Sequence, residues 1–173
     1  MQSLCTIISN AEISPGVRLM WVEAPDIATA AQPGQFITVR CEDFILRRPL
    51  SIHQVAVASG NVIASEARQF QIAILFQVVG KGTLWLSQRQ VGDKIDILGP
   101  LGKGFNIEPS SRNLLLVAGG IGIAPLVFLA QYASPQHSIT LIHGARTIAQ
   151  IYPLSLPNKV RFIPVTEDGS MGE

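Results

Sequence analysis

Short stretches of alternating apolar and polar residues fill the first hundred positions, and turns rich in glycine and proline divide them. The pattern predicts strands over residues 4–9, 17–22, 35–40, 49–53, 72–79 and 94–98. Ser59, Gly60 and Asn61 are typical of a hairpin turn. A short helix is expected over residues 83–88, capped by Thr83. About six short strands with glycine-rich corners predict a small closed β-barrel of the Greek-key type.

After residue 112 the pattern changes to strands that alternate with helices. Residues 113–117 read as a fully apolar strand buried on both faces, followed by a glycine turn and a helix over 124–132. Further elements are expected as a strand over 139–143, a short helix over 148–154 and a strand over 160–165. This alternation predicts a parallel sheet with right-handed crossovers. We therefore expect a barrel domain over residues 1–105, a linker over 106–112 and a partial α/β domain over 113–173.

The composition of the chain argues against some classes of binding partner. Charged residues make up 14% of the chain, against about 25% in typical soluble domains. The net charge of +1 gives no electrostatic case for binding nucleic acid or an acidic membrane. With so few charges, part of the surface is expected to be covered by a partner or a cofactor.

The two cysteines, Cys5 and Cys41, lie too far apart for a metal-ligand motif and are expected to be buried free thiols. The first twelve residues lack the basic start and apolar block of a signal peptide. The uncharged run over residues 114–130 is interrupted by glycines and Pro125, which favours a strand–turn–helix over a membrane span. We expect a cytoplasmic protein without membrane insertion.

Four motifs follow one another along the chain: an arginine pair before Pro49, and glycine-rich turns at 79–83, 99–105 and 119–122. In this order and spacing they resemble the ferredoxin–NADP⁺ reductase superfamily, and within it the electron-transfer subunits of type B dihydroorotate dehydrogenases. The resemblance implies a flavin-binding barrel followed by a nicotinamide-nucleotide domain. It covers nearly the whole chain.

The resemblance assigns FAD binding to the barrel, through Arg48, Pro49, Leu50 and Ser51. Arg48 would contact the pyrophosphate with two hydrogen bonds, Pro49 would fix the backbone, and Ser51 would donate toward N5 of the flavin ring. Taken alone, Arg48 could equally be a solvated surface residue and Ser51 a hydroxyl at a strand edge.

Two further FAD contacts are implied by the next motif and the strand before it. Gly82 and Thr83 would let backbone amides approach a phosphate closely. Leu75, Phe76 and Gln77 fall where the family contacts the flavin from the preceding strand. Relatives tend to carry tyrosine and arginine where this chain has Phe76 and Gln77.

The turn formed by Gly119, Gly120 and Gly122 lies where the superfamily closes against the flavin and binds NAD(P)H. It does not match the G-x-G-x-x-G fingerprint of dinucleotide-binding domains. Arg146, after the next strand, falls where the family meets the adenosine side, although a solvated cation is an equal alternative.

The resemblance implies an oxidoreductase, namely an FAD-binding subunit that passes electrons between NAD(H) and a partner. The partner would be a catalytic dihydroorotate dehydrogenase subunit of pyrimidine biosynthesis. The alternatives are a subunit of a sulfide-hydrogenase or glutamate-synthase type complex, or a non-catalytic remnant that acts as an interaction module.

Neither a protein acid–base residue nor a metal site is expected, because hydride transfer to a flavin requires neither. The three histidines are scattered and are expected to be core or turn residues. The family continues with a Cys-Gly-Pro segment beside the nicotinamide and four cysteines for a [2Fe–2S] cluster, which this sequence lacks. We therefore expect a complete FAD site, poor affinity for the nicotinamide cofactor and no iron–sulfur cluster in this chain.

Overall fold

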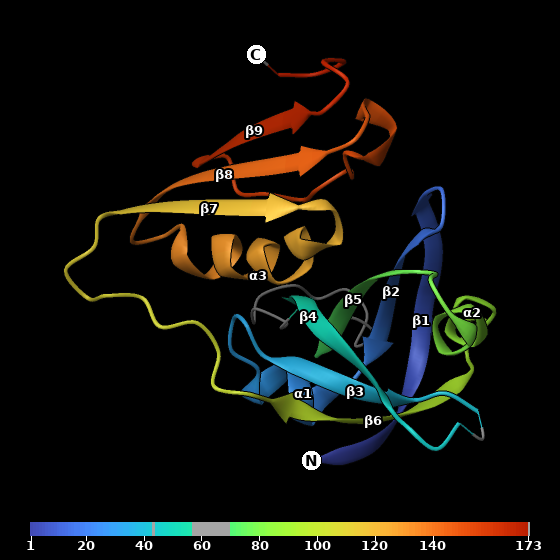
Figure 1. Ribbon diagram of the computed structural model, residues 1–173. Helices are drawn as coiled ribbons and strands as arrows, with labels where there is room; N and C mark the ends of the chain where they lie inside the picture. Colours follow the sequence, from blue (N-terminus) through green and yellow to red (C-terminus); the bar gives the residue numbers. More distant parts are fainter. Residues whose placement is uncertain (43, 57–69, 173) are drawn as a thin grey trace, which may run out of the picture.

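The computed structural model describes residues 1–42, 44–56 and 70–172. It consists of a β-barrel and a three-stranded sheet with one long helix between them (Figure 1). The elements, in chain order, are β1 (Gln2–Ser14), β2 (Val17–Glu23), α1 (Pro25–Ala30), β3 (Phe36–Arg40), β4 (Arg48–Ala56), β5 (Gln71–Gln77), α2 (Lys81–Ser87), β6 (Lys94–Leu101), β7 (Asn113–Gly119), η2 (Gly120–Gly122), α3 (Ile123–Ala133), β8 (Ser138–Ala145), η3 (Ile148–Gln150) and β9 (Val160–Thr166).

Six antiparallel strands close the barrel in the order β1-β2-β5-β4-β3-β6. The connection from β2 to β3 leaves β5 and β4 between them, which is a Greek-key arrangement. Alternate residues of each strand point inward, so that Ile72, Ile74 and Phe76 of β5 lie in the barrel core. The predicted six-stranded barrel is confirmed.

The second half forms a parallel sheet, as predicted, and its strand order is β7-β8-β9. Helix α3 covers the sheet face that carries Leu116 and Leu141, and lies between this sheet and the barrel (Figure 1). The uncharged run at 114–130 is thus divided into β7, η2 and α3.

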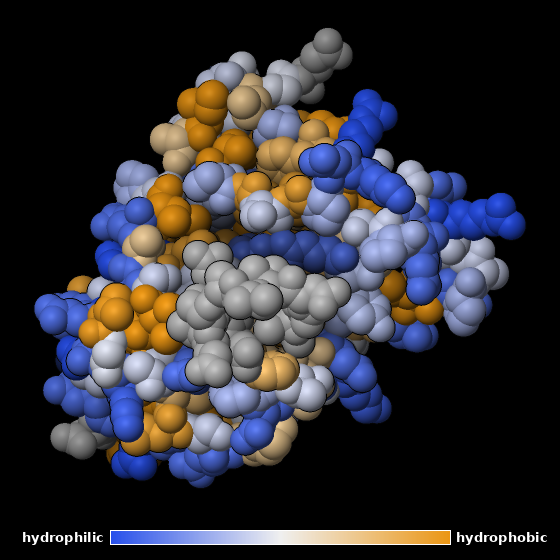
Figure 2. Space-filling model, turned by 180° about the vertical axis from the view of Figure 1, so that it is seen from behind, coloured by the Kyte–Doolittle hydropathy of each residue, from blue (hydrophilic) through white to orange (hydrophobic). Residues whose placement is uncertain are grey.

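The prediction that residues 113–117 are buried on both faces is wrong. Leu115 is 65% exposed and Val117 64% exposed, because they point away from α3 and no described element covers that face of the sheet. From behind, apolar side chains reach the surface in the upper half of the molecule, where the sheet lies (Figure 2).

Three local expectations also differ from the structure. The helix expected at 148–154 is only the single turn η3, and the first strand runs to Ser14 instead of residue 9. Helix α1 was not predicted, because six residues starting at a proline are too short to show helical periodicity. The hairpin expected at Ser59–Asn61 lies outside the described residues.

Several contacts join the barrel to the α/β part. Phe128 of α3 packs into the barrel core, and Leu75 of β5 packs into the core around α3. At the tip of the β1–β2 hairpin, the hydroxyl of Ser14 donates to the carbonyl of Ala149 at 2.8 Å. These contacts bring the end of β5 next to the glycine turn that precedes α3.

No helix in the part of the chain that the structure describes is long and apolar enough to cross a membrane.

Candidate functional site: two adjoining clefts

A cleft of about 490 Å³ lies where the barrel meets the start of α3. Strands β4 and β5 form its barrel side, the start of α2 closes one end, and the glycine turn (residues 119–122) with the start of α3 closes the other. Its lining residues are Arg48, Pro49, Leu50, Ser51, Leu75, Phe76, Gln77, Val79, Thr83, Ile121, Gly122, Ala124 and Pro125. The structure thus brings together residues that the sequence placed in three separate motifs. We call this space the barrel cleft.

Arg48 lies across the first turn of α2. Its Nη1 donates to the carbonyl of Leu46 at 2.7 Å, and its guanidinium lies 5.7 Å from the ring centre of Phe44. A Cβ atom on Gly82 would stand 2.6 Å from Nε of Arg48, so only glycine leaves room for the arginine there. The cation is therefore held beside the backbone amides that begin α2, a pairing that suits a phosphate.

The neighbouring Arg47 has a different role. Its Nη2 lies 2.7 Å from Oδ2 of Asp96 on β6, and its Nη1 donates to the Asp96 carbonyl at 3.3 Å. Gln2 of β1 donates to the same carboxylate. Arg47, which directly precedes β4, is therefore bound to β6, while Arg48 borders the cleft.

The prediction that Thr83 caps α2 is wrong, because the helix begins two residues earlier and Gly80 is the N-cap. Thr83 is the third helical residue, and its Oγ1 accepts hydrogen bonds from the amides of Val79 and Gly80 at 3.0 and 3.2 Å. The side chain therefore fixes the glycine-rich turn that leads into α2.

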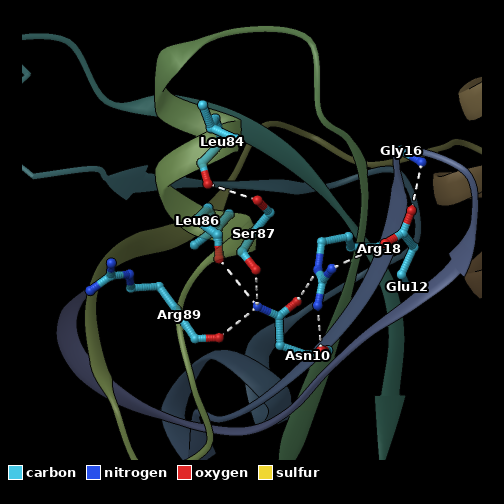
Figure 3. Close-up of polar contacts among 8 residues, drawn as sticks. All are labelled: Asn10, Glu12, Gly16, Arg18, Leu84, Leu86, Ser87 and Arg89. Carbon is cyan, nitrogen blue, oxygen red and sulfur yellow. Dashed lines mark hydrogen bonds and ion pairs between the residues drawn. The ribbon is translucent and has the colours of Figure 1, made fainter.

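At its other end, α2 is held by Asn10 of β1 (Figure 3). The Nδ2 of Asn10 lies 3.2, 3.2 and 2.8 Å from the carbonyls of Leu86, Ser87 and Arg89, of which the first two end α2 and the third lies just beyond it. Arg18 of β2 holds Asn10 in turn, with Nε 2.9 Å from its Oδ1. These bonds satisfy carbonyls that a helix end leaves without partners, and they fix α2 against the barrel wall.

On β5, the three predicted flavin contacts point in different directions. Phe76 is 2% exposed and packs in the barrel core, so its side chain supports the floor of the cleft from below. Leu75 is also buried, on the side that faces α3. Gln77, at the end of the strand, is exposed and borders both this cleft and the next one.

A second cleft of about 660 Å³ lies at the carboxyl ends of β7, β8 and β9. Gly119, Gly120 and Ile121 of the glycine turn form one wall, and Arg146 and Thr166 lie on the far side. This is the edge of a parallel sheet where nucleotides commonly bind. We call it the sheet cleft. The glycine turn separates the two clefts, with Ile121 bordering both.

Two of the three histidines are buried and contact the backbone around the glycine turn. Nδ1 of His53 lies 2.9 Å from the Ala124 carbonyl, and Nε2 of His143 lies 3.0 Å from the Gly120 carbonyl. Burial lowers the pKa of both imidazoles, so both are neutral at neutral pH. The expectation that they are core residues is confirmed for this pair.

We did not predict Val79, Ile121, Ala124 or Pro125 as cofactor contacts, although all four line the barrel cleft. Each lies in or close to a glycine-rich turn, so these turns marked the correct segments. Which apolar neighbours face the cleft depends on the packing of the barrel against α3, which leaves no local signal in the sequence.

The two thiols do not contribute to either cleft. Cys5 and Cys41 are free and buried, as expected, and burial raises the pKa of both, for Cys5 to about 11. In the described part of the chain, no group of three or more histidine, cysteine or acidic side chains could hold a metal ion.

A closed six-stranded barrel followed by a parallel sheet, with a cleft on each side of a glycine turn, defines a protein with the ferredoxin-reductase-like fold. The structure of an NADH-dependent reduced ferredoxin-NADP oxidoreductase superimposes with a TM-score of 0.80. It is 30% identical and covers 98% of this chain, which covers 59% of that chain.

No protein-family model matches the chain. In sequence, the chain is similar to the electron transfer subunit of dihydroorotate dehydrogenase B (NAD⁺) from Desulforamulus reducens, with 41% identity over 166 residues. The subunit of the same name from Geobacillus thermodenitrificans is 34% identical over 174 residues. These matches cover 92% and 96% of this chain but only 60% and 64% of the relatives' length. The resemblance predicted from the sequence is confirmed.

Proposed function

We propose that this chain is an FAD-binding electron-transfer subunit, with the flavin in the cleft between β4, β5 and α3. The observation that carries the proposal is the placement of Arg48 across Gly82 at the start of α2, at one end of a mostly apolar cleft. A flavin dinucleotide needs a cation with backbone donors for its pyrophosphate and a flat apolar bed for its ring, and this cleft offers both.

The residues present fit such a cofactor. Arg48 and the amides at the start of α2 would hold the pyrophosphate, and Ser51 would donate to the polar edge of the ring. Leu50, Leu75 and Pro125 supply apolar contact. The volume of about 490 Å³ lies within the usual range of small-molecule sites. When bound, the flavin would accept a hydride and pass on single electrons.

The sheet cleft would bind NAD(H). Gly119, Gly120 and Gly122 carry no side chains, and a Cβ on any of them would meet nothing within 4 Å, so a ligand can approach the backbone closely. Arg146 supplies a cation on the opposite wall. The nicotinamide end would then meet the flavin across Ile121.

The partner would be a catalytic dihydroorotate dehydrogenase subunit, as the names of the curated relatives indicate. We also propose that this chain carries no iron–sulfur cluster, because it has two cysteines and such a cluster needs four protein ligands.

The test is to purify the protein, measure its flavin and iron content, and follow flavin reduction after addition of NADH. We expect about one FAD per chain, no iron, and slow flavin reduction by NADH, because the affinity for the nicotinamide cofactor is expected to be poor. A protein that takes up no FAD on reconstitution would overturn the proposal. Recovery of a dihydroorotate dehydrogenase subunit with the tagged chain would test the partner separately.

A further inference from the structure

We propose that His53 and His143 are positioning residues that hold the glycine turn and the start of α3 from two sides, and so set how the two clefts meet. The proposal rests on the proposed function only for the identity of the two ligands, FAD and NAD(H). It concerns a pair of side chains to which neither the motifs nor the comparisons assign a role.

The glycine turn is a segment that its own side chains do not fix. Three of its four residues are glycines, Gly120 has a positive φ of 49°, and a Cβ on any of the three would meet no atom within 4 Å. A segment of this kind has many accessible conformations, and hydrogen bonds from outside are needed to select one.

His143 supplies one such bond from the sheet. It lies on β8, is fully buried, and packs against the rings of Tyr152 and Phe162 with centroid distances of 5.4 and 6.4 Å. A carbonyl only accepts, so the contact with Gly120 requires the proton on Nε2. Nδ1 has no partner among the described residues, which leaves the bond to Gly120 as the ring's polar anchor.

His53 supplies the second bond from the barrel. It lies on β4 at an irregularity in the pairing with β5, between Ile52 and Gln54, and is 4% exposed. Its Nδ1 must carry the proton, because the partner is again a carbonyl, that of Ala124 in the first turn of α3. The two histidines therefore need opposite tautomers.

The two accepting carbonyls lie four residues apart, on the segment that separates the clefts. One donor comes from β4, whose first residues line the barrel cleft, and the other from β8, whose last residues line the sheet cleft. Because Ile121 borders both clefts between these two anchors, a shift of this segment would change the distance between the bound rings. The rate of hydride transfer from NADH to the flavin depends steeply on that distance, whereas the affinity for either ligand alone depends on it weakly.

The first test uses the unaltered protein without cofactor. Nitrogen NMR of the imidazole rings should show His143 protonated at Nε2 and His53 protonated at Nδ1. The same tautomer for both rings would overturn the proposal, whether or not the protein binds FAD.

The second test uses variants matched to the donor atom. Asparagine at 53 places an amide near the position of Nδ1, and glutamine at 143 places one near Nε2, while leucine at either position has similar size and no donor. We expect His53→Leu and His143→Leu to slow NADH reduction of bound FAD on the order of tenfold, with the FAD dissociation constant within about twofold. His53→Asn and His143→Gln should restore most of the rate.

The outcomes are distinguishable. Equal rates for the leucine and amide variants would overturn the positioning role, as would a loss of FAD affinity that matches the loss of rate. If a leucine variant fails to fold, the tautomers and the amide variants still decide the proposal. Failure of the wild type to bind FAD would count against the proposed function alone.

Discussion

Nε of Arg48 lies 2.6 Å from the position that a Cβ atom on Gly82 would occupy. The two residues are 34 positions apart, yet the glycine is what allows the arginine to lie across the start of α2. The contact places a cation and a glycine-rich turn, each a weak signal in the sequence, together as one candidate phosphate site.

Replacing Arg48 by alanine should weaken FAD binding by roughly 1.5–3 kcal/mol, the usual worth of a charged hydrogen bond. Arg47→Ala is the matched control, because Arg47 is bound to Asp96 and does not line the cleft. It should lower the free energy of unfolding by about 1 kcal/mol, a modest value because the pair is partly exposed, and change FAD affinity little. Titrations of flavin fluorescence and urea unfolding measure the two effects. Equal loss of FAD affinity in both variants would contradict separate roles for the two arginines.

Gly82→Ala should weaken FAD binding without destabilising the fold. The backbone of Gly82 is helical, and alanine is favoured over glycine there by up to about 1 kcal/mol. The atoms that the new Cβ would meet belong to the flexible side chain of Arg48, which can swing away and leave the cleft.

A double-mutant cycle checks this explanation for Gly82. In an Arg48→Ala background, the alanine at 82 should cost little further FAD affinity. Additive losses from the two changes would mean that Gly82 acts on the ligand independently of Arg48.

Asn10→Ala should destabilise the protein by about 1–3 kcal/mol, because it removes the side-chain donor to the Ser87 and Arg89 carbonyls at the end of α2. Glu12→Gln is the control from the same network (Figure 3), since it removes only a partly exposed 3.6 Å ion pair with Arg18. It should cost less than about 0.5 kcal/mol. Urea unfolding of both variants makes the comparison, and similar losses would argue against Asn10 as the anchor of α2.

Stability should fall as the pH is lowered below about 6.5. Burial holds the pKa of His53 and His143 below that of an unfolded histidine, so the unfolded chain binds more protons in this range. The contribution of the two neutral histidines to the free energy of unfolding is therefore complete above the pKa of an unfolded histidine. It is lost as the pH falls toward the pKa values in the folded protein.

Urea unfolding between about pH 5 and 7.5 measures this dependence. The double variant His53→Asn, His143→Gln should show a flatter profile. An unchanged slope in the double variant would assign the pH dependence to other groups.

The sequence predicted the strands of the barrel, the parallel sheet and the segments that form the clefts, because alternation and glycine turns are local signals. It did not separate the roles of Arg47 and Arg48, since Asp96 lies on a strand far along the chain. For the same reason Asn10, whose partners lie 76 to 79 residues away, left no signal. The two histidines were expected only as core or turn residues, because their carbonyl partners are set by the packing of α3 against the barrel and the sheet.

The misplaced N-cap of α2 also has a physical reason. Threonine is a common N-cap, and at position 83 its hydroxyl does accept backbone amides, but from the third helical position. Gly80 provides the extended backbone at which the helix begins.

The most direct test of the account is hydrogen exchange of the backbone amides with and without FAD, read by mass spectrometry. We predict that FAD slows exchange in residues 48–51, 75–84 and 119–125, and leaves the β8 and β9 strands unchanged. Protection confined to other segments, or no protection at saturating FAD, would contradict the placement of the flavin in this cleft.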